Sequence, residues 1–96
     1  MKFVLTASWT AKSGEEERVR SALEQLTGPS RAEPGCLYYQ PTRSNDDPRL
    51  FLIYEEYVDE DAYKAHAESE HFKRYGLGEA IPLLESRERA FYTSLD

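Results

Sequence analysis

The sequence predicts one α+β domain whose strands and helical regions follow the order β-α-β-β-α-β. Three observations predict it. Apolar residues alternate with polar ones near both ends of the chain, they recur with helical spacing in two regions between, and turn-forming residues separate these segments. This order is that of the split-βαβ or ferredoxin-like arrangement, a four-stranded antiparallel sheet with both helices on one face. A chain of 96 residues has room for a single such domain, residues 1–96.

The first strand and the first helix show the two periods most clearly. Alternate residues of the predicted strand 3–10 share an apolar face: Phe3, Leu5, Ala7 and Trp9. Ser13 and Glu16 have the spacing of a capping box, so a helix should begin near Gly14. Its apolar stripe consists of Val19, Ala22, Leu23 and Leu26. One side of this helix should therefore pack on the sheet.

Turns define the second strand. Gly28-Pro29 could end the first helix, although this proline could also open a further helical turn. Pro34-Gly35 predicts a turn, after which residues 36–43 form a strand. Pro41 has no N–H to donate to a neighbouring strand, so this strand should lie at an edge of the sheet.

The third strand, residues 49–58, is apolar on both of its faces. Its apolar run is Leu50, Phe51, Leu52, Ile53 and Tyr54. A sheet exposed to water on one side would show clean alternation instead, so both faces should be covered. The helices cover only one face, and an exposed apolar face would favour aggregation. A second subunit is the simplest cover, and a homodimer is expected.

The second helical region should be bent. Asp59 followed by two acidic residues is a strong helix start, and Ser69 could cap a second helical piece. Residues 85–93 then form the last strand.

Charge and composition exclude several classes of partner. Eighteen acidic and twelve scattered basic residues give a formal charge of −6, so no basic patch for nucleic acid is expected. No apolar run reaches the roughly 18 residues of a membrane span, and Ser8 and Lys12 come too early for a secretory signal. Cys36 stands alone and is interpreted as a small buried residue, not a nucleophile. A soluble protein of the reducing cytoplasm is expected.

Two stretches resemble the antibiotic biosynthesis monooxygenase family. One runs from Phe51 to Phe72, where an apolar strand leads into a capped helix with both histidines; the other is Arg31-Ala-Glu-Pro-Gly-Cys-Leu-Tyr-Tyr39. The resemblance implies a dimeric α/β barrel, with each pocket between a sheet and its own helices. It also implies a cofactor-free monooxygenase that acts on a quinol, phenol or polyketide-like aromatic. Haem-degrading relatives differ from this chain at three places: Ala7-Ser8, Tyr57 and Phe72-Lys-Arg-Tyr-Gly76.

His66 is the first candidate for catalysis. It shares a helix face with Ala62 and Tyr63, which directs it toward the sheet, and imidazole suits proton transfer. A packed histidine with a hydrogen-bonding partner is the structural alternative. His71 is a weaker candidate for substrate binding, since its charged neighbours favour a structural or partly exposed position. No metal site is expected, because histidines five apart on a continuous helix point in different directions and no carboxylate cluster completes a set.

Tyr57 is the second catalytic candidate, because the family commonly ends this strand with Glu-x-Trp where this chain has Glu55-Glu56-Tyr57. Tyrosine combines a large apolar ring with a hydroxyl that can orient a flat ligand, although core packing is the alternative for each tyrosine. Glu55 is expected in a covered region, with a partner or a raised pKa, or in an ion pair with Arg89. The candidate substrate-binding residues are Trp9, Phe51, Ile53, Glu55, Tyr63, His71, Phe72 and Tyr75.

Two other functions remain open. Residues 54–62 and the helix histidine also resemble a bacterial isomerase of a phosphorylated autoinducer; there His66 would transfer protons while Arg74 or Arg89 bound the phosphate. The second alternative is a non-catalytic barrel that binds a small aromatic ligand or acts as a stress-related dimer. A pocket filled by Trp9 and the tyrosines would favour it.

Overall fold

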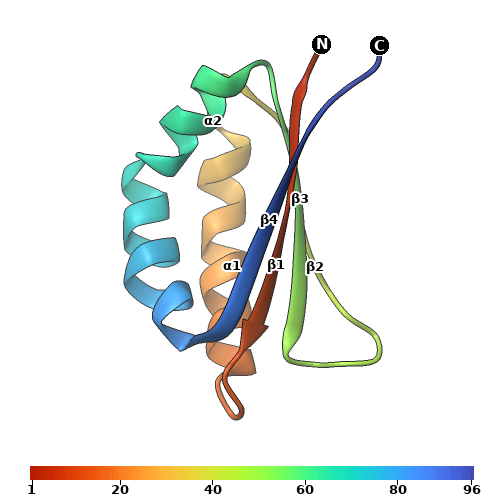
Figure 1. The fold of residues 1–96 in the computed structure, drawn as a ribbon. Coiled ribbons are helices and arrows are strands. Elements are labelled where there is room, and N and C mark those ends of the chain that lie inside the picture. The colour runs from red at the N-terminus through yellow and green to blue at the C-terminus, as the bar shows by residue number, and fades with distance from the viewer.

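Four antiparallel strands form one sheet, and the helical segments pack on one of its faces (Figure 1). The computed structural model describes residues 1–96. The strands are β1 (Phe3–Ala11), β2 (Cys36–Arg43), β3 (Leu50–Tyr57) and β4 (Leu84–Thr93). The helical segments are α1 (Glu16–Arg31), α2 (Glu60–Ala67), the π-helical η1 (Phe72–Ala80) and the short 3₁₀ turn η2 (Ile81–Leu83). The predicted element order and ferredoxin-like arrangement are confirmed.

The strand order β2-β3-β1-β4 places the first and third strands at the centre of the sheet. In β1, Leu5 lies opposite Glu55 of β3 on one side and Phe91 of β4 on the other. β2 pairs only with β3, so the edge position predicted from Pro41 is confirmed. Because β3 is a central strand, its residue Glu55 lies beneath the helices that cover this face of the sheet.

α1 begins later and ends later than its sequence signals suggest. Gly14 adopts a positive φ of 88°, and its N–H donates to Glu16 Oε1 at 3.0 Å. Because the chain turns at this glycine, the helix starts at Glu16 and the predicted Ser13 capping box does not form. At the other end the helix continues through Pro29 to Arg31, which settles the open alternative. The predicted apolar stripe is buried, as expected: Val19, Ala22, Leu23 and Leu26.

The second helical region breaks after Ala67, as predicted from Ser69. The Ser69 hydroxyl donates to the carbonyl oxygen of His66 at 2.7 Å and accepts from the N–H of Phe72 at 3.2 Å. The side chain thus joins the end of α2 to the start of η1.

No helix of the protein is both long enough and apolar enough to span a membrane.

The two faces of the sheet differ sharply. The helix-facing side is closed by a core that includes Ala7, Trp9 and Ile53 together with the α1 stripe. On the helix-free side, Leu52 is 42% exposed, and Tyr38 and Tyr92 are about half exposed. The predicted apolar character of both faces is therefore present, and the second face is uncovered in the single chain.

Candidate functional site

A cavity of about 250 Å³ lies between the helix-facing side of the sheet and the α2–η1 region. Its lining residues come from β1, β3, β4, α2 and η1. They are Leu5, Ala7, Trp9, Glu55, Tyr63, His66, Ala67, Phe72, Leu77, Arg87 and Arg89. Glu55 and His66 are buried, whereas Arg87 and Arg89 are exposed, so the cavity has a closed carboxylate–imidazole end and an open cationic end. A larger groove of about 610 Å³ between α1 and β2 contains neither histidine.

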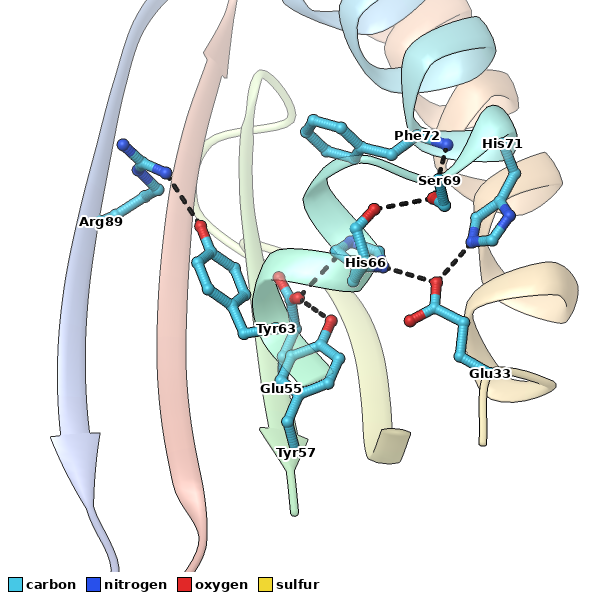
Figure 2. A network of polar contacts seen from close by, with 9 residues as sticks. All are labelled: Glu33, Glu55, Tyr57, Tyr63, His66, Ser69, His71, Phe72 and Arg89. Carbon is cyan, nitrogen blue, oxygen red and sulfur yellow. Dashed lines mark hydrogen bonds and ion pairs between the residues drawn. The ribbon is translucent and has the colours of Figure 1, made fainter. Parts of the chain in front are cut away.

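His66 is held between two carboxylates (Figure 2). Its side chain is 3% exposed; Nδ1 lies 2.8 Å from Glu33 Oε2, and Nε2 lies 3.8 Å from Glu55 Oε1. A carboxylate oxygen only accepts, so in the neutral imidazole the proton lies on Nδ1 and the lone pair of Nε2 faces Glu55 and the cavity. A histidine oriented by a carboxylate in this way can serve as a proton acceptor.

Aromatic rings fix the plane of the His66 imidazole. The ring centroids of Tyr39, Tyr57 and Phe72 lie 5.3–5.6 Å from it. These rings exclude water and leave the imidazole little freedom to rotate. The histidine is therefore both packed and hydrogen-bonded, and it also reaches a cavity.

Glu55 is a buried carboxyl group whose partners differ from the expected arginine. The Tyr57 hydroxyl donates to Glu55 Oε1 at 2.6 Å, while Arg89 donates to the Tyr63 hydroxyl at 2.8 Å. The alternative of a Glu55–Arg89 ion pair is therefore wrong. Burial raises the pKa of Glu55, although the Tyr57 hydrogen bond and the His66 charge oppose the shift. Burial and the Glu55 charge raise the pKa of Tyr57, so its hydroxyl remains a donor.

Glu33 is the member of the site that the sequence patterns missed. It follows α1, in the Glu33-Pro34-Gly35 segment that predicted only a turn. A Cβ added to Gly35 would lie 2.4 Å from the Cβ of Ala62, so the turn packs directly on α2. This close approach brings Glu33 to His66. A polar residue beside a glycine-containing turn was the only available signal.

Both histidines reach the same carboxylate. His71 Nε2 hydrogen-bonds to Glu33 Oε2, the oxygen that also contacts His66. The expectation that they point in different directions, with no carboxylate to complete a set, is wrong, because the break at Ser69 separates His66 in α2 from His71, which directly precedes η1.

The remaining predicted site residues divide into two groups. Trp9, Tyr63 and Phe72 line the cavity, as does Glu55. The others lie elsewhere: Phe51 and Ile53 in the core beside α1, Tyr57 beneath Glu55, His71 beyond His66, and Tyr75 against the core with Arg74 over its ring. None of these five residues lines the cavity. Some of them face other helix surfaces, and the others lie beneath the residues that form the cavity wall.

Replacing Glu55 with glutamine should stabilise the fold at neutral pH while keeping an acceptor for Tyr57. A raised folded-state pKa means that the folded protein binds more protons than the unfolded chain above about pH 4.5. Wild-type stability should therefore fall as the pH rises from that value through the folded-state pKa. We expect the Tm difference, Glu55→Gln minus wild type, to grow over this window in thermal melts. Glu56→Gln, on the opposite face of β3, controls for loss of one charge; equal changes in both variants would contradict the prediction.

Comparisons with known proteins agree with this fold. The family model described as antibiotic biosynthesis monooxygenase matches residues 2–76. PA3566 of Pseudomonas aeruginosa is 34% identical, with a TM-score of 0.91 over 99% of this chain and 95% of that one. SO0527 of Shewanella oneidensis is 32% identical, with a TM-score of 0.88 over 95% and 88%.

A third structure, from Nitrosomonas europaea, is provisionally named an antibiotic biosynthesis monooxygenase. It is 25% identical, with a TM-score of 0.91 over 98% of this chain and 99% of that one. No functionally curated protein matches the chain. Because the family model matches well over half of its residues, this protein belongs to the antibiotic biosynthesis monooxygenase family.

Proposed function

We propose that the protein is a cofactor-independent monooxygenase of electron-rich aromatic hydroxyl compounds, such as quinols and anthrone-type phenols. The observation that supports this most directly is the position of His66, which lines the cavity beside Glu55 while its Nδ1 lies 2.8 Å from Glu33 Oε2. Family membership supports the oxygenase class.

His66 performs the proton transfer in this proposal. Nε2 accepts the proton of the bound hydroxyl, and the resulting imidazolium lies between Glu33 and Glu55, whose negative charges stabilise it. The electron-rich anion then passes an electron to O₂. For an anthrone, the methylene becomes a carbonyl and the second oxygen atom leaves as water, so no external reductant is needed.

The cavity suits a small aromatic body. Its volume of about 250 Å³ lies just below the ~300–1,000 Å³ range of ligand pockets, which favours compact substrates of one to a few rings. Trp9, Tyr63 and Phe72 provide aromatic walls. Shielding by these rings favours anion chemistry, since water would otherwise compete for the charge.

The test is oxygen consumption by metal-stripped protein over a panel of naphthoquinols and anthrone-type phenols. Uptake above the spontaneous rate, with one labelled atom from ¹⁸O₂ in the product, is the expected result. No uptake with any compound would reject the proposal for these substrate classes.

Glu33→Gln should lower kcat roughly 10- to 100-fold, less than the 10²–10⁴-fold effect typical of removing the base itself. The amide can donate to Nδ1 and so favour the tautomer with its proton on Nε2. KM should change little, because Glu33 does not line the cavity. A long-range ¹H–¹⁵N spectrum reports the tautomer directly; unchanged kcat and tautomer would show that Glu33 does not orient His66.

An isomerase remains the second candidate, favoured by the two guanidinium groups at the open end of the cavity. Arg87 and Arg89 could bind the phosphate of a small sugar-like signal while His66 moved protons. Arg74 is not suited to this role, because it stacks on Tyr75 outside the cavity. Turnover of a phosphorylated ketose without oxygen would favour this candidate, and a purely ligand-binding barrel would show neither reaction.

We also propose that two copies pair through their helix-free sheet faces, where Leu52, Tyr38 and Tyr92 are exposed. Leu52→Asp should weaken the dimer at least roughly 30-fold, because it buries a charge at an apolar contact. Light scattering during size-exclusion chromatography measures the shift to monomer. Leu95→Asp, at the nearly fully exposed carboxyl terminus, is the control. A Leu52→Asp protein as dimeric as this control would contradict the interface.

A further inference from the structure

The two histidines of the chain meet at one carboxylate on the side of His66 away from the cavity. One oxygen or nitrogen atom each from Glu33, His66 and His71 lies within 4.8 Å of the other two (Figure 2). Neither Glu33 nor His71 lines the cavity. Potential ligands from the turn after α1, from α2 and from the residue before η1 therefore converge outside the proposed substrate site.

The donor types select a class of ion. Two imidazole nitrogens with one carboxylate oxygen suit zinc and neighbouring divalent transition metals, whereas magnesium and calcium prefer oxygen ligands. Ligand atoms at about 2.0–2.2 Å from such an ion lie roughly 3–4 Å from one another. Glu33 Oε2 lies 2.8 Å from His66 Nδ1, and the three atoms lie within 4.8 Å of one another. To admit the ion, Glu33 would move outward and the partly exposed His71 would move slightly toward His66.

The surroundings of His66 also suit a metal ligand. Metal-bound histidines commonly donate their other N–H to a carboxylate, which fixes the ring and raises its basicity. Here Glu55 lies 3.8 Å from Nε2 and is itself held by the Tyr57 hydroxyl. The aromatic rings around His66 limit its movement further.

We propose that Glu33, His66 and His71 form a three-ligand site for a divalent transition-metal ion such as Zn²⁺ or Co²⁺, with water completing the coordination. On binding, the His66 proton moves from Nδ1 to Nε2, where it faces Glu55.

The test is titration of tag-free, metal-stripped protein with Co²⁺, read by visible d–d absorption, with Zn²⁺ as competitor. One equivalent should bind, and Zn²⁺ should displace it. Because the chain has only two histidines, a long-range ¹H–¹⁵N spectrum with Zn²⁺ should shift His66 Nδ1 and His71 Nε2 specifically. No substrate is present, so the result is independent of the proposed oxygenase activity.

His71→Ala and Glu33→Gln should each weaken Co²⁺ binding at least roughly tenfold. Glu70→Gln is the matched control, since it removes one exposed negative charge beside His71 without removing a ligand. Melting curves and far-UV spectra verify that each variant is folded. Binding that is equal in wild type and His71→Ala, or nitrogen shifts at only one histidine, would overturn the site. Equal weakening by Glu70→Gln would show nonspecific electrostatic attraction instead.

Discussion

Replacing His66 with glutamine is expected to lower kcat for oxygen uptake by roughly 10²–10⁴-fold, the range typical of losing a general base. Glutamine retains a polar side chain between Glu33 and Glu55 but has no group that accepts a proton near neutral pH. KM should change less, because most of the cavity wall is left in place. Steady-state oxygen uptake with the best substrate from the panel measures both constants.

His71→Gln is the matched control, because it makes the same substitution at the only other histidine. His71 contacts Glu33 but does not line the cavity, so its loss should reduce kcat less than tenfold. Both proteins are compared by near-UV circular dichroism before the kinetics are interpreted. Equal losses in the two variants would mean that the histidines act as a structural pair, and retained activity in His66→Gln would exclude His66 as the base.

The fold was largely predictable because its signals are local. The alternation of apolar residues predicted which face of β1 turns toward the helices. The helical spacing of apolar residues predicted which side of α1 is buried. Ser69 marked the helix break because a hydroxyl can satisfy backbone groups that the helix leaves free. The start of α1 was misplaced because Gly14 adopts a positive φ, which removes Ser13 from the capping position.

The site was only half predictable, since its central contact joins residues far apart in the chain. His66 and Glu55 each lie on a periodic element, so the sequence indicated which way they point. Glu33 is 33 residues from His66, and their contact depends on how closely the turn approaches α2. The periodicity of apolar residues carries no information about the distance between two segments far apart in the chain. The convergence of His71 on the same carboxylate was missed for that reason, even though the break at Ser69 was predicted.

Gly35→Ala should destabilise the protein by roughly 1–3 kcal/mol, the cost typical of overpacking. The new Cβ would lie 2.4 Å from the Cβ of Ala62, and neither methyl group belongs to a flexible side chain that can turn away. The turn is also tied to the end of β3, because the Val58 N–H donates to the Gly35 carbonyl at 2.9 Å. The strain should therefore separate the turn from α2 and loosen the Glu33–His66 contact. Urea unfolding measures the free-energy loss.

A double-mutant cycle with Ala62→Gly identifies the cause. Glycine at position 62 costs about 1 kcal/mol of helix stability by itself, but it removes the methyl group that the new Cβ would overlap. Gly35→Ala/Ala62→Gly should therefore be more stable than the sum of the two single changes predicts. Gly28→Ala is the contrasting control: apart from its chain neighbours and helix backbone, a Cβ added there meets nothing within 4 Å, so its effect should add to that of Ala62→Gly without coupling. Strict additivity in the cycle would mean that overlap with the Ala62 methyl group is not what destabilises Gly35→Ala.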